Sequence, residues 1–362
     1  MPHEAMSMRE LIETHRVIVC TGSGGVGKTT TSAALAVAAA MLGKRVLVLT
    51  IDPAKRLATT LGIANSSHDV RVPRQKWRGE LWAGLIDPTR IFNEFIERHS
   101  PDQAAVERMF ANKLYQQLST TLSGSQEFTS LSRLLDASVS GNYDLVILDT
   151  PPSSHAVDFL RAPEKLNAVF DSTIVSIFMG RATGLGFAAN AWKQGMKMIL
   201  GTLKILTGSE FVSNFSDFFG AADAVAPDIR EISMQAHRLL LAPSTAFVLI
   251  SSFDMAKIQE GEAFHDELGK AGYHLRKVII NRAWPHWALA DPVTQRQVEK
   301  QLRAKGLSAT ADSYKELAAY YAQRQNLHPR FDDVLTIPEM DEEIVGLTAL
   351  EQLAERLLGE TK

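Results

Sequence analysis

A glycine-rich stretch near the start of the chain carries the residue types that bind phosphate. It reads GSGGVGKT over residues 22 to 29 and satisfies the P-loop pattern. Glycines let backbone N–H groups curl around a phosphate, because a side chain would block their approach. The Lys28 ammonium can then reach the β- and γ-phosphates, and the Thr29 hydroxyl can ligate Mg²⁺. The pattern predicts that this chain binds ATP or ADP together with Mg²⁺.

Every residue of this loop is a predicted nucleotide contact. They are Gly22, Ser23, Gly24, Gly25, Val26, Gly27, Lys28 and Thr29. The alternative is a glycine-rich turn that binds nothing. A predicted strand precedes the loop and a predicted helix follows it, and the helix N-terminus contributes partial positive charge. The complete pattern in this context argues against the alternative.

Two aspartates follow apolar runs and could act on the same phosphate. Asp149 ends the run LVILD, where a Walker-B acid would orient Mg²⁺ through water. Its alternative role is that of a loop aspartate accepting a turn hydrogen bond. Asp52 follows the run VLVLTI and could position or deprotonate an attacking water. Asp52 could also cap a helix, and the two roles are compatible.

These residues need a strand and a helix to position them. Val17 to Thr21 is a β-branched run, Lys28 to Leu42 is an alanine-rich helical stretch, and Arg45 to Thr50 predicts the next strand. Further predicted strands are Leu81 to Ile86, Leu145 to Asp149, Ala246 to Ser251 and Lys277 to Asn281. Apolar strands that alternate with helices predict an α/β fold with a mostly parallel sheet covered on both faces, here a P-loop NTPase core.

Two long stretches interrupt this alternation and have helical spacing without a strand pattern. They run from about residue 90 to 140 and from about 163 to 233, and we interpret them as helical insertions that form a subdomain. With no linker-like tract in the chain, we predict a single P-loop ATPase domain over residues 1–362 that carries this subdomain.

Composition limits the class of partner. A net charge of −3 gives no electrostatic case for nucleic acid or an anionic membrane. The single cysteine, Cys20, excludes an intrachain disulfide and a cysteine-built metal site. The N-terminus lacks the apolar core of a signal peptide, and no apolar run reaches the roughly 18 residues of a membrane span. We expect a cytoplasmic protein that is not integral to a membrane.

Five blocks of sequence carry a resemblance to one family. The blocks are GGVGKTTTSAALA, DPAKRL, DTPPSSHAVDFL, VIINRA and IPEMDEEIVGLTALEQL, spread over roughly residues 16 to 358. They resemble the P-loop, the two switches and the adenine-proximal segments of the arsenite-pump (ArsA) and tail-anchored-protein-targeting (Get/TRC) ATPases, within the MinD/ParA-like deviant Walker A class. The resemblance implies hydrolysis of ATP to ADP and phosphate by a homodimer.

The resemblance also implies roles for individual residues. Thr30 would join Lys28 and Thr29 at the phosphates and Mg²⁺. Asp52 would activate water in the first switch, and Asp149 would be the acid of the second. His155 matches the histidine of the second switch, and its alternative role is that of a structural residue. Asn281 would face adenine, with Pro338 in the adenine-proximal loop.

The first variable position of the P-loop departs from that family. Its signature lysine reaches the partner subunit's nucleotide, whereas this chain has Ser23, which cannot supply a cation. Either hydrolysis is slow or another basic residue substitutes. Lys55 and Arg56, beside Asp52, are the candidates. The alternative is that both are solvated helix residues.

Further departures concern cysteine. Cys20 alone cannot form the thiolate site of an arsenite pump, and the zinc-binding CxxC pairs of the targeting ATPases are missing. In the targeting branch, helices that correspond to Phe170 to Phe219 form a groove for a client's transmembrane helix, so a hydrophobic protein client or a membrane receptor is a candidate partner. The alternative for this Met- and Phe-rich stretch is an ordinary helical core.

Two other function classes fit the P-loop. One is a nucleotide-gated binding module that hydrolyses ATP negligibly, which Ser23 favours. The other is a P-loop kinase that acts on a small acceptor, which the adenine-loop match and the DTPPSSH segment disfavour. A relative of the nitrogenase iron protein is excluded, because the cluster cysteines are missing.

Overall fold

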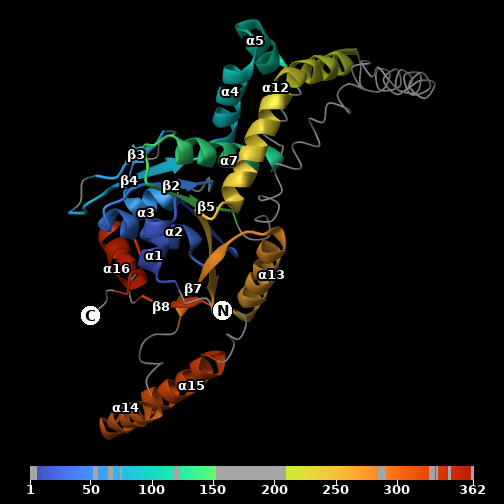
Figure 1. Cartoon of the computed structure of the whole chain (residues 1–362). Helices are drawn as coiled ribbons and strands as arrows, with labels where there is room; N and C mark the ends of the chain where they lie inside the picture. The colour runs from blue at the N-terminus through green and yellow to red at the C-terminus, as the bar shows by residue number, and fades with distance from the viewer. Residues whose placement is uncertain are drawn as a thin grey trace. The chain divides into compact units, whose positions relative to one another are not determined.

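The computed structural model describes most of the chain in separate ranges (Figure 1). These are residues 6–51, 56–63, 68–73, 76–113, 115–116, 123–151, 209–283, 291–325, 331, 333–340 and 344–359. The chain divides into two compact units. The sheet unit comprises Met1–Leu85, Ser140–Val157 and Leu241–Lys362, and the helical unit comprises Ile86–Val139 and Asp158–Leu240. The assignment of both to one ATPase domain stays a prediction.

An eight-stranded sheet organises the sheet unit, in the order β3-β4-β2-β5-β1-β6-β7-β8. Neighbouring strands are parallel except for the pair β3 and β4. The strands are β1 (Val17–Gly22), β2 (Arg45–Thr50), β3 (Val70–Arg71), β4 (Glu80–Leu85), β5 (Leu145–Asp149), β6 (Thr245–Ser252), β7 (Leu275–Ala283) and β8 (Val334–Pro338). The predicted α/β fold with a mostly parallel sheet is confirmed, and the two short edge strands β3 and β8 were not predicted.

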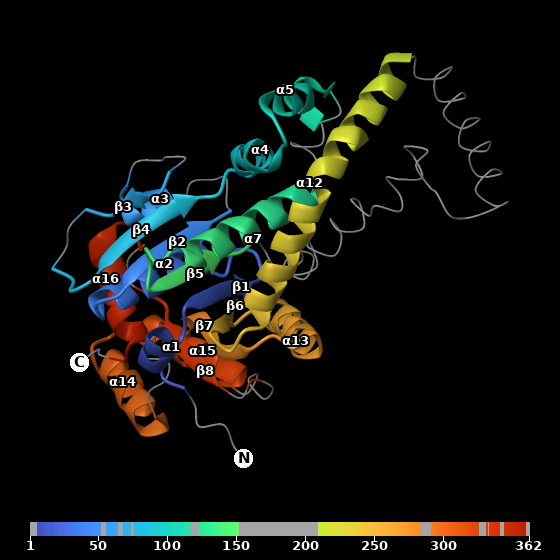
Figure 2. The ribbon, with the colours of Figure 1, turned by 45° about the horizontal axis from the view of Figure 1, so that its top comes forward.

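Helices cover both faces of this sheet, which explains why its central strands are apolar throughout. Successive side chains of a strand point to opposite faces, and all six residues of β1 are buried. On one face α2 (Lys28–Met41) contacts β1, β2, β4 and β5 and is itself covered by α16 (Leu347–Leu357) (Figures 1 and 2). On the other face α13 (Met255–Ala271) packs with Gly261 near Leu249.

The remaining helices of the sheet unit are short or peripheral. They are α1 (Met8–Thr14), α3 (Arg56–Leu61), α14 (Pro292–Ala304) and α15 (Ser308–Gln325). Helix α1 adds Met8, Leu11 and Ile12 to the core on the α2 face. Helices α14 and α15 contact each other, and α14 buries none of its residues.

Strand β1 lies where the direction of the sheet's connections reverses. The chain goes from β1 by way of α2 to β2, on the far side of β5, whereas β6 pairs with β1 on its other side. Such a switch point leaves a crevice outside the carboxyl ends of the strands, and ligands of open α/β sheets bind there. The loop at residues 22–29 begins at this edge.

Four helices of the helical unit are described, and they enclose an apolar core of their own. They are α4 (Pro88–His99), α5 (Gln103–Ala111), α7 (Ser123–Val139) and α12 (Ser209–Leu241). The core includes Phe95, Phe128 and Phe218. Of the predicted stripe from Phe170 to Phe219, residues up to 208 lie outside the described residues. Within the part of the chain that is described, no helix is long and apolar enough to cross a membrane.

Candidate nucleotide site

The backbone of the P-loop takes a path that two of its glycines make accessible. Gly22 has φ +149°, and a Cβ there would lie 1.9 Å from the carbonyl oxygen of Ile250 on the neighbouring strand. Gly27 has φ +89° at the N-cap of α2, and a Cβ there would lie 2.4 Å from Nδ2 of Asn281. Gly24 and Gly25 are exposed at the mouth of the loop. The loop thus lies close to Ile250 of β6 and to Asn281 of β7, and it opens outward at Gly24 and Gly25.

Lys28 is the first residue of α2, and its side chain folds back over the loop. The Nζ atom donates to the carbonyl oxygen of Ser23 at 2.8 Å, and the residue is buried. A buried ammonium needs acceptor partners, because burial removes its hydration. The loop carbonyl thus holds the ammonium over the loop, and its contact with phosphate oxygens stays a prediction.

Asp149 is the centre of a buried cluster of hydroxyl groups. Its Oδ2 accepts hydrogen bonds from Oγ1 of Thr29 at 2.7 Å and from Oγ1 of Thr50 at 3.0 Å. The register of the sheet explains why these side chains lie together, since Asp149 lies opposite both Cys20 of β1 and Thr50 of β2. With 2% of its surface exposed, Asp149 is screened little from neighbouring charges.

The donor set at Thr29 and Asp149 fits a magnesium ion. Magnesium takes oxygen ligands, keeps several waters, and is usually held by one or two carboxylates together with phosphate oxygens. One hydroxyl and one carboxylate 2.7 Å apart beside the phosphate loop match that description. In the described part of the chain, no three His, Cys, Asp or Glu side chains gather in a way that could hold a metal.

Asn281 contacts the P-loop directly. Its Nδ2 donates to the carbonyl oxygen of Val26 at 2.9 Å, across 255 positions of sequence. Pro338 pairs with Ala283 at the end of β8, so it lies beside the same end of β7. Arg282, the residue after Asn281, has φ +50°, an uncommon conformation for a residue with a side chain. The structure thus brings Asn281 and Pro338 to the nucleotide edge, and their contact with adenine stays a prediction.

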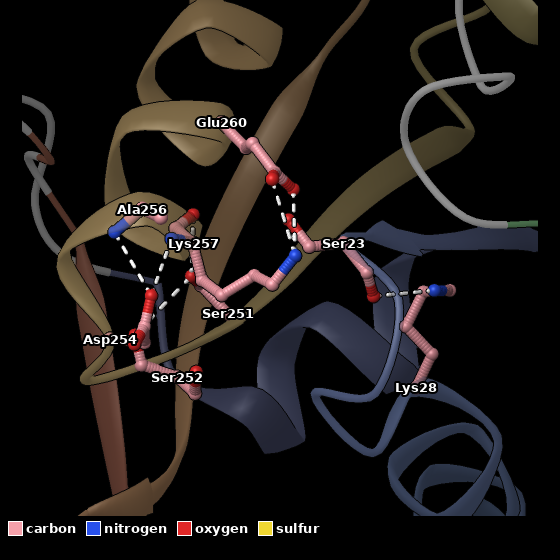
Figure 3. Close-up of polar contacts among 8 residues, drawn as sticks. All are labelled: Ser23, Lys28, Ser251, Ser252, Asp254, Ala256, Lys257 and Glu260. Carbon is pink, nitrogen blue, oxygen red and sulfur yellow. Dashed lines mark hydrogen bonds and ion pairs between the residues drawn. The ribbon is translucent and has the colours of Figure 1, made fainter.

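Ser23 has a partner that was not predicted from the sequence. Its hydroxyl is hydrogen bonded to the carboxylate of Glu260, which also accepts from Nζ of Lys257 at 3.2 Å to each oxygen (Figure 3). Ser23 itself is 2% exposed. In sequence, a lysine and a glutamate three apart are indistinguishable from an ordinary surface pair on a helix. Only the pairing of β6 with β1 brings this helix to the P-loop.

Several predicted residues cannot be placed. Asp52, Lys55 and His155 lie outside the described residues. Arg56 begins α3, but its side chain is among those left undescribed. Thr30 is half-buried in the first turn of α2. The suggestion that Lys55 or Arg56 replaces the missing cation therefore stays a prediction.

Cys20 is a structural residue of β1. Burial raises the pKa of its thiol to about 12, so the group is protonated at neutral pH. Because the thiolate is the nucleophile and the metal ligand, a protonated thiol serves neither role.

The same loop, strand and helix are contained in a family match that spans nearly the whole chain. The model of the family described as "Anion-transporting ATPase" matches residues 15–359. The chain belongs to this family. The predicted resemblance and the predicted enzyme class, an ATPase, are confirmed by the match.

Three named relatives of this ATPase show how far the similarity extends. ATPase get3 of Schizosaccharomyces pombe is 26% identical over 340 residues, which cover 93% of this chain and 89% of that protein. ATPase GET3 of Malassezia globosa is 26% identical, with 94% and 90% covered. The putative arsenical pump-driving ATPase 1 of Aquifex aeolicus is 25% identical, with 95% and 79% covered. The similarity to each of the three extends well beyond the P-loop.

Proposed function

We propose that this chain hydrolyses Mg-ATP to ADP and phosphate at the P-loop, and that its nucleotide state switches a homodimer and the helical unit. The bond between Thr29 and Asp149 carries the proposal. It joins the P-loop residue suited to Mg²⁺ with the acid at the end of a neighbouring strand, an arrangement shared by P-loop NTPases. A glycine-rich turn without a nucleotide role does not require that juxtaposition.

Each residue of the site would have a separate role in ATP hydrolysis. Lys28 would exchange the Ser23 carbonyl for phosphate oxygens, and the loop N–H groups would bind the remaining oxygens. Thr29 and Asp149 would hold Mg²⁺, which neutralises phosphate charge when bound. Asp52, outside the described residues, would position the attacking water.

Phosphate release from ATP, measured over a range of protein concentrations, tests this proposal. Lys28→Ala and Asp149→Asn should each lower turnover about 10²-fold or more, because each removes an electrostatic contact to the reacting phosphate or its metal. Lys270→Ala on the exposed end of α13 is the matched control and should leave turnover unchanged. Turnover that survives Lys28→Ala would contradict the proposal.

A nucleotide-gated module with negligible hydrolysis is the second candidate. The observation that favours it is the Ser23 side chain, which is engaged with Glu260 and carries no positive charge. Native turnover discriminates the two. If native turnover is negligible and Ser23→Lys restores it, the gated module is the better description.

The dimer belongs to the same proposal and has its own measurement. Sedimentation should show a larger species with Mg-ATP than with ADP, because closure around the terminal phosphate would tighten the dimer. Equal sedimentation in both states would contradict nucleotide-driven dimerisation.

The final part of the proposal is that the chain acts in the cytoplasm and binds a hydrophobic client there. The proposed client rests on the Met- and Phe-rich composition of residues 170–219, because such apolar side chains suit promiscuous recognition. A fluorescent transmembrane-helix peptide should bind the native chain with an affinity that depends on ATP. Equal affinity with ATP and ADP would contradict coupling between client and nucleotide.

A further inference from the structure

The P-loop has a second polar side, opposite the Thr29 and Asp149 cluster. Strand β1 has β5 on one side, which supplies Asp149, and β6 on the other. Helix α13 follows β6 after two intervening residues. Gly22 lies opposite Ile250 in the register of β1 and β6, so the loop starts beside the strand end from which α13 departs.

The start of α13 is fixed to that strand end. Oδ1 of Asp254 accepts from the backbone N–H groups of Ala256 and Lys257 at 3.0 and 3.3 Å, the bonds of a helix N-cap. Oγ of Ser251 donates to the carbonyl oxygen of Lys257 at 3.1 Å. Figure 3 shows these contacts beside the loop. The first turn of α13 is therefore held at a defined place.

Lys257 and Glu260 lie one turn apart on this helix, and the Glu260 carboxylate contacts both Lys257 and Ser23. The hydrogen bonds from Ser23 and then from Lys257 hold the pKa of the Glu260 carboxyl below its usual range, so it is ionised at neutral pH. The carbonyl oxygen of Ser23 accepts from Lys28. Ser23 thus lies between the ammonium that meets the terminal phosphates and an ion pair on α13.

An ionised carboxylate at this position is unfavourable for a bound triphosphate. Like charges at close range repel, and water screens part of this repulsion because the Glu260 side chain is 48% exposed. Lys257 offsets that charge. Its side chain is 31% exposed, and its flexible four-carbon stem lets the ammonium move by several Å.

We propose that Lys257 is a second phosphate-contacting cation of this site, which moves from the Glu260 carboxylate to the terminal phosphate of bound ATP. The contacts of Ser23 with Lys28 and Glu260 carry this inference. It rests on the proposed function and deepens it, because it names the cation at the P-loop position where this chain has a serine. Before ATP binds, the Glu260 carboxylate is the partner of Lys257.

Separate binding measurements for ATP and ADP, each with Mg²⁺, test the proposal by calorimetry without depending on turnover. Lys257→Met should weaken ATP binding about tenfold, the size expected of one charge-assisted hydrogen bond, and leave ADP binding within about twofold. Lys257→Arg keeps the charge and should retain most of the ATP affinity. Lys270→Met is the matched control, a lysine on the same helix that should change neither affinity.

Glu260→Gln separates this role from a structural one by the sign of its effect. If Lys257 serves the phosphate, removing the competing carboxylate should leave ATP affinity equal to the native value or raise it. If the ion pair only holds the loop in shape, Glu260→Gln and Lys257→Met should both weaken ATP and ADP equally, and that result would overturn the inference.

These experiments distinguish a failure of the proposed function from a failure of the inference about Lys257. Native chain that binds Mg-ATP without releasing phosphate contradicts the hydrolysis proposal, while the ratio of ATP to ADP affinity still decides the role of Lys257. An unchanged ratio in Lys257→Met with normal native turnover overturns the inference alone.

Discussion

At the scale of single residues, Gly27 offers a sharp test of the loop. Alanine there would be strained at φ +89°, and its Cβ would displace the Asn281 amide that bonds to Val26. We expect Gly27→Ala to lower stability by about 1–3 kcal/mol and to weaken ATP binding. Part of the binding loss should disappear in an Asn281→Ala background, where no amide is displaced. Calorimetry of ATP binding to the native chain, the two single variants and the double variant measures this. Fully additive effects of the two substitutions on ATP binding would contradict the contact between position 27 and Asn281.

His15 gives the molecule a predictable response to pH. It is buried and bonded through Nδ1 to the carbonyl oxygen of Leu11 at 2.9 Å. Burial lowers the pKa of His15, and the charges of Arg276 and His274 act in the same direction. The unfolded chain therefore takes up this proton more readily than the folded one, and stability falls as pH drops below about 6.5.

A substitution isolates that contribution. His15→Gln keeps a side chain that can donate to the Leu11 carbonyl but cannot titrate. Denaturant unfolding at pH 7.5 and 5.5 should show a larger loss of stability on acidification for the native chain than for the variant. Equal losses in the two chains would contradict the burial argument.

At the scale of elements, α2 shows how tightly the phosphate helix is packed. Its alanines from Ala33 to Ala40 have no exposed surface, because the helix lies between the sheet and α16. Ala36→Leu should cost about 1–3 kcal/mol through overpacking. Ala304→Leu at the exposed end of α14 is the control and should change stability by about 0.5 kcal/mol or less. Equal stability of the Ala36→Leu and Ala304→Leu variants would contradict the close packing of α2.

At the scale of the whole molecule, the chain's last described helix completes a core begun by its early ones. Leu350, Leu353 and Leu357 of α16 are buried in the cluster that contains α2. Nε1 of Trp77 donates to Oε1 of Glu351 at 2.7 Å and joins α16 to the segment before β4. Leu353→Ala should cost about 2–5 kcal/mol in denaturant unfolding. Glu355→Ala, on the exposed side of α16, is the control, and a similar cost there would contradict this packing.

Much of the geometry of the candidate site could be predicted because its signals are local. A strand, a glycine-rich loop and a helix follow each other in sequence, so the pattern from Val17 to Met41 predicted the loop and the place of Lys28. Asp149 could be assigned because parallel strands share one carboxyl edge. The edge strands β3 and β8 were missed, since short half-buried segments lack the apolar run that marks a central strand.

The sequence by itself therefore determined the fold class, the family and the phosphate-binding chemistry, since these depend on residue types within short windows. The tertiary structure decided which distant groups meet the loop: Thr50 at Asp149, Asn281 at Val26, and Glu260 with Lys257 at Ser23. These meetings depend on strand order and register, which follow from the packing of the whole sheet and not from any local pattern. The partner of Ser23 could be identified only from the tertiary structure, because the sheet places helix α13 beside the phosphate loop.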